Sequence, residues 1–195
     1  MNLKKLNRIV NMGYKIIIKQ GNLINEEYAT FIVNASNTRL VLGTGVSMAF
    51  KQRCGRELQK EMIEAIEKVG HPLQKGDVVI TSSGRARNFE HALHACVMDY
   101  NPGLSYKDKA PSLMNIYEIL LNIEQYLKLY EEKTSKPTRL VLPLMGSGVG
   151  GLDKKEVLNV YKEFFSKNTD LTCGVVIYGF NADDYAKIHD CFGNI

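Results

Sequence analysis

The sequence contains no apolar run close to the ~20 residues that a membrane-crossing helix needs, so we expect no membrane contact. Its first residues carry Lys4, Lys5 and Arg8, but no apolar stretch with a small-residue cleavage site follows, which argues against a secretory signal. No basic run of five or more is present, and the formal charge of +4 is modest. The charge therefore gives weak support at most to nucleic acid as a partner, and an anionic small molecule would suit it equally.

Cysteine is scarce and scattered along the chain. The four cysteines, Cys54, Cys96, Cys173 and Cys191, include no C-x-x-C pair, so the sequence signals neither a zinc site nor a disulfide framework. This usage fits a reducing cytoplasm, and we expect no metal and no other cofactor. The chain also lacks internal repeats, low-complexity tracts and linkers, and its 195 residues suit one domain with a sizeable core.

Short β-branched runs alternate with longer segments of helical period, which predicts an α/β sandwich with helices on both faces of one sheet. The predicted strands are residues 14–20, 30–35, 77–83, 91–97, 139–144 and 174–180. We interpret residues 1–11 as a loose N-terminal arm and residues 12–195 as a single domain. Met12 directly precedes the first strand and is an alternative start of translation.

The predicted helices each carry one apolar stripe for the sheet. One begins near Val46 and continues through Phe50, Cys54, Leu58 and Met62. Apolar residues also recur every three or four positions over residues 113–130 and 157–164. Residues 99–111 form the longest polar connection, with two prolines and a glycine as breakers, and predict a surface loop.

Two glycine-rich turns point to an anion site. "LGTGV" and "GSGVGG", residues 146–151, each lie between an apolar run and a helix start. Glycine there leaves backbone N–H groups accessible, and a helix N-terminus adds partial positive charge. Tight turns alone would also explain one such loop. Two loops in one small domain favour a diphosphate held between them.

Known phosphate motifs do not account for these turns. A dinucleotide fingerprint would need glycine where Met48 stands, and no acidic residue closes a following strand at the required distance. A P-loop would need lysine and a hydroxyl where Leu152 and Asp153 stand. Neutral amides are thus the main expected contacts, which suits a diphosphate that is bound but not cleaved.

The motifs in their order, "QGNLI…IVNASNTRLVLGTGVSMAF…GDVVIT…HALHACV…LVLPLMGSGVGG…VVIYGFN", resemble the macrodomain family. The match runs from about residue 14 to the end. The family consists of modules that bind ADP-ribose and in many members hydrolyse its derivatives. The resemblance implies a three-layer α/β/α sandwich around a central mixed β-sheet, with ADP-ribose lying across the strand ends.

The resemblance also implies a set of ligand-binding residues. Asn22 takes the place of the usual adenine-binding aspartate, Phe180 matches the aromatic residue that stacks on adenine, and Asn37 matches the asparagine that reaches the distal ribose. For Asn34 an alternative stays open, in which it only caps its own turn and does not contact the ligand. The complete set is Asn22, Leu23, Asn34, Ala35, Asn37, Gly43, Thr44, Gly45, Val46, Ser147, Gly148, Val149, Gly150, Gly151, Phe180 and Asn181.

The catalytic candidates are Asn37, Ser47 and Asp153. In the branch that removes ADP-ribose from acidic side chains, an aspartate stands at the position of Ser47 and an aromatic residue at that of Gly150. Both departures argue against that activity. At Ser47 the reason is that a hydroxyl of ordinary acidity is a poor general base. Asp153, with Glu156 three residues later, has the pattern of a helix cap. Asn37 would then position the distal ribose and a water that the bound diphosphate helps to activate.

Three functions stay open. The first is a metal-independent hydrolase acting on O-acetyl-ADP-ribose, ADP-ribose 1''-phosphate or protein-linked mono-ADP-ribose. The second is a non-catalytic reader of ADP-ribose or of ADP-ribosylated proteins, which Ser47 and Gly150 favour. The third is an RNA- or poly(A)-binding module, which only the mild positive charge and nucleic-acid-binding members of the family support. The sequence does not choose a natural substrate.

Overall fold

The computed structural model describes residues 13–193, so the predicted N-terminal arm, residues 1–11, lies outside the described part of the chain. Six strands form one mixed sheet in the order β1-β6-β5-β2-β4-β3, and the pairing of β3 with β4 is antiparallel while the others are parallel. The strands are β1 (Gly13–Gln20), β2 (Ala29–Asn37), β3 (Val78–Ser82), β4 (Phe89–Met98), β5 (Thr138–Pro143) and β6 (Thr172–Gly179). All six predicted strands are confirmed, each within two residues at either end.

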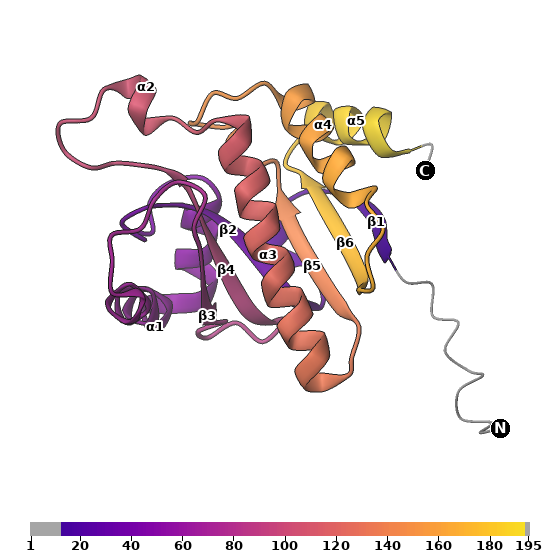
Figure 1. The fold of residues 1–195 in the computed structure, drawn as a ribbon, viewed down its shortest axis with the longest axis horizontal. Helices are drawn as coiled ribbons and strands as arrows, with labels where there is room; N and C mark the ends of the chain where they lie inside the picture. Colours follow the sequence, from indigo (N-terminus) through magenta and orange to yellow (C-terminus); the bar gives the residue numbers. More distant parts are fainter. Residues whose placement is uncertain (1–12, 194–195) are drawn as a thin grey trace.

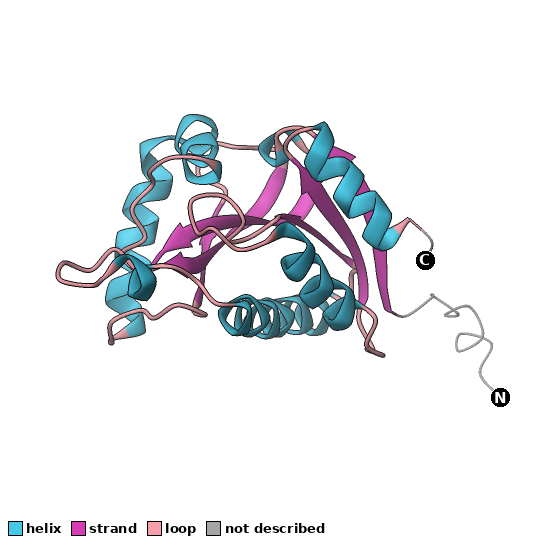
Figure 2. Cartoon of the chain, turned by 90° about the horizontal axis from the view of Figure 1, so that it is seen from above, coloured by secondary structure: helices cyan, strands magenta, loops and turns pink. Residues whose placement is uncertain are grey.

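Helices cover both faces of the sheet, so the predicted three-layer arrangement is confirmed (Figures 1 and 2). Because alternate side chains of a strand point to opposite faces, Phe31 and Val33 pack into one core and Ile32 packs into the other. The first core lies under α3 (Leu113–Thr134), α4 (Lys154–Phe165) and α5 (Ala182–Phe192), and the second lies under α1 (Val46–Val69). Two short segments, the 3₁₀ helix η2 (Leu23–Asn25) and α2 (Tyr106–Lys109), complete the elements.

Helix α1 is interrupted, whereas the sequence predicted a continuous helix. At Gly55 the backbone has φ 79° and ψ −173°, a conformation outside the helical region. The turn between β3 and β4 closes the gap, because the Arg85 N–H donates to the Cys54 carbonyl at 2.9 Å. Arg85 belongs to the sequence Gly-Arg-Ala-Arg of residues 84–87, and its side chain is exposed. This turn thus joins the break in α1 to the β3–β4 connection.

A buried carboxylate anchors the segment between β1 and β2. Glu26 is 2% exposed and accepts hydrogen bonds from Lys19 Nζ at 2.9 Å, Arg139 Nη2 at 2.8 Å and Tyr178 Oη at 2.7 Å. Burial alone would raise the pKa of Glu26, but these three donors together lower it. The carboxylate therefore connects β1, β5 and β6 at one point and holds the Tyr178 hydroxyl in place.

Candidate functional site

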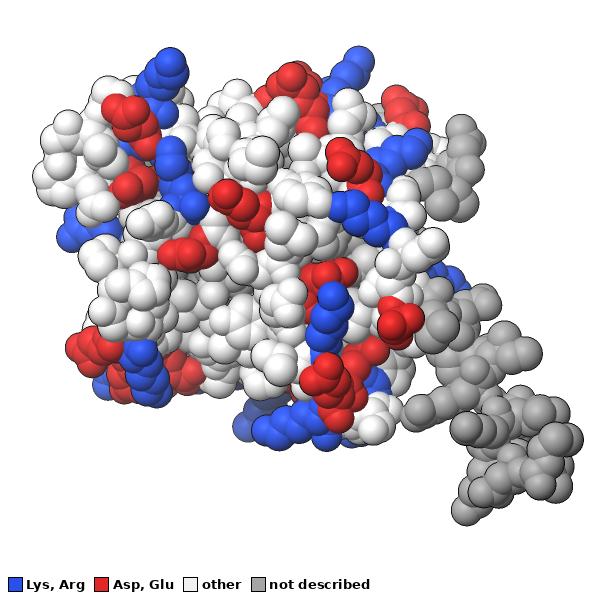
Figure 3. Space-filling view, in the orientation of Figure 1, with Lys and Arg blue, Asp and Glu red and all other residues white. Residues whose placement is uncertain are grey.

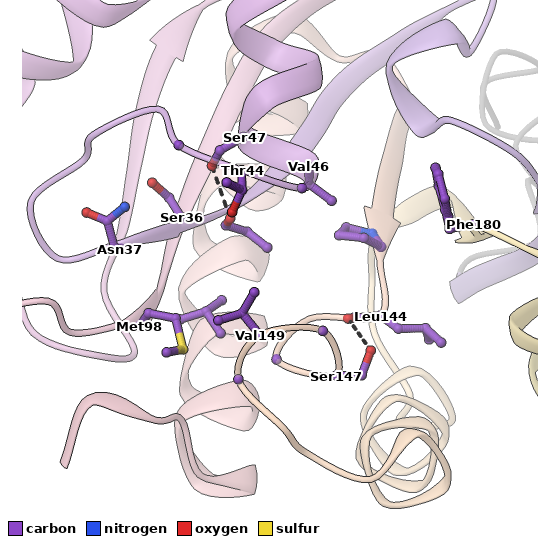
Figure 4. Close-up of a pocket in the computed structure, with 18 of the residues that line it drawn as sticks. Ser36, Asn37, Thr44, Val46, Ser47, Met98, Leu144, Ser147, Val149 and Phe180 are labelled. Carbon is purple, nitrogen blue, oxygen red and sulfur yellow. Dashed lines mark hydrogen bonds between the residues drawn. The ribbon is translucent and has the colours of Figure 1, made fainter. Parts of the chain in front are cut away.

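A cavity of about 620 Å³ opens at the carboxyl ends of the parallel strands (Figure 4). The ends of β2, β4, β5 and β6 supply its floor, and the two glycine-rich turns stand on opposite sides of it. Parallel strands bring their carboxyl ends to one edge of the sheet, which is why segments far apart in the sequence meet there. Of the predicted residues, those that line the cavity are Ala35, Asn37, Gly43, Thr44, Gly45, Val46, Ser47, Ser147, Gly148, Val149, Gly150 and Phe180.

The first glycine turn leads directly into α1. Gly45 is the N-cap residue, with φ 60° and ψ −133°, and no side chain caps this end of the helix. The first helical amides consequently have no side-chain acceptor and lie beside the cavity. An uncapped helix N-terminus with a glycine approach is a favourable place for a negatively charged group.

The second glycine turn is held in shape by its own backbone and by packing. The amides of Gly151 and Leu152 donate to the carbonyls of Gly148 and Gly146, and the Ser147 hydroxyl donates to the Leu144 carbonyl at 2.9 Å. For the amides of residues 148–150 the described residues provide no hydrogen-bond acceptor. These amides are therefore available to a ligand.

The aromatic ring of Phe180 lies at the opposite end of the cavity from Asn37 (Figure 4), and an ion pair also lines the cavity. Phe180 is 76% exposed, and its amide donates to Asp184 Oδ2 at 3.2 Å. Asp184 is buried and pairs with Lys154 at 2.5 Å. Hydrogen bonds and charge attraction from Asp184 and Asp183 raise the pKa of Lys154. The pair fixes the N-terminal ends of α4 and α5 relative to Phe180.

Asn37 lines the cavity, but its side chain also organises the adjoining loop. Its Nδ2 donates to the Val41 carbonyl at 2.9 Å, and its Oδ1 accepts from the amides of Arg39 and Val41 at 3.1 and 3.4 Å. The loop includes Leu40 at φ 47°, an uncommon conformation for a residue with a side chain. One amide hydrogen of Asn37 has no acceptor among the described residues.

Ser47 and Asn34 belong to a buried polar chain. Ser47 Oγ donates to Asn34 Oδ1 at 2.9 Å, and Asn34 Nδ2 donates to His94 Nδ1 at 3.1 Å. The proton of His94 then lies on Nε2, which donates to Thr81 Oγ1 at 2.8 Å, and Thr81 donates onward to the Ser82 carbonyl. Burial lowers the pKa of His94 to about 3. His94 is thus neutral and structural, and Asn34 is fully buried rather than in the cavity wall.

The other predicted site residues are not part of the cavity lining. Asn22 caps η2 through Ile24, and Asn181 caps α5 through Asp184. Asp153 caps α4 by accepting from the amides of Lys155 and Glu156 at 2.8 and 3.1 Å, in agreement with the predicted cap. Leu23 is in the core and Gly151 ends the second turn. Residues 13–193 contain no helix that is long and apolar enough for a membrane span.

Sequence reasoning missed several residues of the cavity wall. They are Ser36, Val97, Met98, Tyr100, Pro143, Leu144, Gly146, Lys154, Tyr178 and Asp184. Most lie at or next to the carboxyl ends of predicted strands, and this position is the feature of the sequence that could have indicated them. Lys154 and Asp184 carried no such signal, because only the folded chain brings the starts of α4 and α5 together.

The fold and the cavity define an α/β/α protein with a cavity at its parallel strand ends, between two glycine-rich turns. The model of the Macro domain family matches residues 33–161, and the chain belongs to this family. An uncharacterized protein of Saccharolobus solfataricus is 32% identical over 187 residues, which cover 94% of this chain and 95% of the relative. A macro domain-containing protein of Listeria monocytogenes is 31% identical over 141 residues, which cover 72% and 73%.

Solved macrodomain structures share the fold. The Oceanobacillus iheyensis macrodomain with ADP matches with a TM-score of 0.74 at 22% identity, covering 92% of this chain and 90% of that one. The Trypanosoma brucei macrodomain in complex with ADP-ribose matches with a TM-score of 0.69 at 18% identity, covering 90% and 68%. The family and the fold class predicted from the sequence are therefore confirmed.

Proposed function

We propose that this protein binds ADP-ribose or a derivative of it across the cavity. The adenine ring would stack on Phe180, the diphosphate would lie between the two glycine turns, and the second ribose would extend toward Asn37. The observation that carries the proposal is the pair of turns with free backbone amides on opposite sides of one cavity. Two fold relatives hold ADP and ADP-ribose, which supports the same class of ligand here.

The contacts available to the diphosphate are mainly neutral. Lys154 is the one Lys or Arg side chain in the described cavity wall, and Asp184 neutralises it. Backbone amides and the N-terminus of α1 would therefore provide most of the attraction. The cavity volume of about 620 Å³ lies within the range of roughly 300–1,000 Å³ that is usual for small-molecule sites.

The charge distribution gives no support to a nucleic-acid interface on the face drawn in Figure 3. Lysine and arginine side chains alternate there with aspartate and glutamate, without a patch of one sign. A nucleic-acid interface normally clusters basic residues. We therefore place RNA or poly(A) below ADP-ribose as a ligand.

Metal-independent hydrolysis of ADP-ribose derivatives is the second candidate function. Asn37 favours it, because this side chain borders the cavity at the end proposed for the second ribose and keeps one amide hydrogen available. The hydroxyl of Ser47 and the carboxylate of Asp153 are both engaged in structural hydrogen bonds. A reaction would thus depend on a positioned water and on the substrate's own diphosphate.

Calorimetric titration with ADP-ribose and AMP tests binding, followed by turnover assays on O-acetyl-ADP-ribose, ADP-ribose 1''-phosphate and a protein carrying mono-ADP-ribose. We expect ADP-ribose to bind and to stabilise the protein by about 3 kcal/mol at a hundredfold excess over Kd, and AMP to do far less. Equal effects of the two ligands would contradict the proposed site. Binding without product in any assay would identify a reader of ADP-ribose or of ADP-ribosylated proteins.

Asn37→Ala separates the two candidate functions. If Asn37 positions the reacting ribose, the variant should lose turnover strongly and lose less affinity for ADP-ribose, because orientation acts mainly on the transition state. A variant with unchanged turnover would exclude the positioning role. The loop contacts of Asn37 make a melting curve of the free variant a necessary control.

A further inference from the structure

The hydroxyl groups of the cavity wall differ in whether the protein satisfies them. Three of them have protein partners: Ser47 donates to Asn34, Ser147 to the Leu144 carbonyl and Tyr178 to Glu26. Thr44 and Tyr100 are exposed, so water can satisfy their hydroxyls. One hydroxyl of the wall, that of Ser36, fits neither description.

Ser36 is buried and lacks a hydrogen-bond partner. Its side chain is 4% exposed, and its Oγ is a buried polar atom for which the described chain supplies neither donor nor acceptor. A buried hydroxyl without a partner is unfavourable, so its persistence in a cavity wall indicates a group that arrives from outside. Ser36 is therefore a candidate contact for the ligand.

The strand pairing is irregular directly beside Ser36. Ser36 is opposite Cys96 in the β2–β4 ladder, but the next residue, Asn37, is opposite Met98, so Val97 forms a bulge. Bulges bend a strand and redirect side chains, and they are frequent beside functional sites. Figure 4 shows Ser36 between Asn37 and the turn that carries Thr44 and Ser47.

We infer that Ser36 binds the second ribose of the ligand and so discriminates ADP-ribose from ADP. The inference rests on the proposed function, which directs that ribose toward Asn37, the neighbour of Ser36. A neutral hydroxyl both donates and accepts a hydrogen bond, which matches the hydroxyl groups of a sugar. ADP ends at the second phosphate and has no group that reaches this part of the cavity.

The test compares Ser36→Ala with the wild type by calorimetric titration of ADP-ribose and of ADP. We expect ADP-ribose to bind about tenfold more weakly to the variant, since one net hydrogen bond is lost, and ADP to bind as before. The melting temperature of the free variant should be unchanged or higher, because the substitution removes an unsatisfied group. If the role of Ser36 were purely structural, the substitution would lower the melting temperature.

Two further variants keep the result unambiguous. Ser36→Cys retains the size of the side chain with a weaker donor, and should bind ADP-ribose with intermediate affinity. Ser166→Ala removes a hydroxyl that bonds to the Lys162 carbonyl at the C-terminal end of α4, and should leave both affinities unchanged. An equal loss of ADP and ADP-ribose binding in Ser36→Ala, or no loss, would overturn the inference. A wild type that fails to bind ADP-ribose would instead refute the proposed function.

Discussion

At the scale of single residues, the glycines of the two turns divide by what their missing side chains would meet. A Cβ on Gly146 would lie 2.8 Å from Leu152 Cδ1, and one on Gly150 would lie 2.6 Å from the Gly146 carbonyl oxygen. Packing against the protein thus accounts for these two. A Cβ on Gly45 or Gly148 would meet no protein atom within 4 Å, and both residues line the cavity. The absence of a side chain at Gly148 is therefore explained better by the space that a ligand needs than by packing against the protein.

Gly148→Glu should abolish ADP-ribose binding while the protein stays folded. The backbone at Gly148 is outside the positive-φ region, so a side chain introduces no backbone strain. The glutamate carboxylate would, however, occupy the space proposed for the phosphates and repel their negative charge. Calorimetric titration measures the binding, and circular dichroism with thermal melting verifies the fold.

Asn168→Glu is the matched control for this substitution. Asn168 is exposed on the connection between α4 and β6, which enters the sheet at the amino end of β6, away from the cavity. The substitution Asn168→Glu adds the same charge and should leave ADP-ribose affinity unchanged. A folded Gly148→Glu protein with wild-type affinity would show that the second turn does not hold the diphosphate.

At the scale of helices and strands, Asp153 acts as a cap for α4. Asp153→Ala should lower the free energy of unfolding by about 1 kcal/mol, because two first-turn amides lose their acceptor. ADP-ribose binding and any turnover should be nearly unchanged. Denaturant unfolding and the turnover assays check both parts. A normally folded variant without turnover would reverse the assignment and make Asp153 a catalytic base.

The break in α1 predicts a second effect at this scale. Gly55→Ala should destabilise the protein by roughly 1–3 kcal/mol, because its backbone conformation is accessible almost only to glycine. A Cβ there would also lie 2.2 Å from Arg85 Nε and would displace that side chain. Gly174→Ala, in β6 at an ordinary φ with no contact closer than 4.0 Å, is the control and should be near neutral. Equal unfolding free energies for both variants would contradict the strain.

The sequence predicts regular elements better than contacts between them. The six strands follow from β-branched runs, and the two glycine turns follow from contiguous motifs. Helix α5 was missed because Tyr185, Ile188 and Phe192 form only a short stripe. The break at Gly55 depends on a turn about thirty residues later, and the bulge beside Ser36 depends on the pairing of β2 with β4. Such features arise from tertiary packing, which no local pattern encodes.

At the scale of the whole molecule, His94 makes folding stability depend on pH. The pKa of His94 is about 3 in the folded state and about 6.5 when unfolded, so the unfolded chain binds more protons between these values. The contribution of His94 to the free energy of unfolding is complete above the pKa of the unfolded chain and is lost as pH falls toward 3. The free energy of unfolding should therefore decrease by up to ~1.4 kcal/mol per pH unit within this window.

Denaturant unfolding of the wild type and of His94→Gln between pH 6.5 and 5 isolates this effect, because most carboxyl groups titrate at lower pH. The variant should have a smaller slope of unfolding free energy against pH, whatever its stability at neutral pH. His71→Gln, at an exposed histidine in the connection after α1, is the control and should retain the wild-type slope. Identical slopes in all three proteins would exclude His94 as the source.

The polar chain from Ser47 to Thr81 also gives the molecule an internal spectroscopic reporter. Because Asn34 donates to His94 Nδ1, the imidazole proton lies on Nε2, fully buried and bonded to Thr81. Such a proton exchanges slowly with solvent, so we expect a resolved imidazole ¹⁵N–¹H correlation at neutral pH. Ser47 borders the cavity and begins the same chain, so adding ADP-ribose should shift this resonance. Occupancy of the site thus becomes readable at an atom inside the core that no ligand touches.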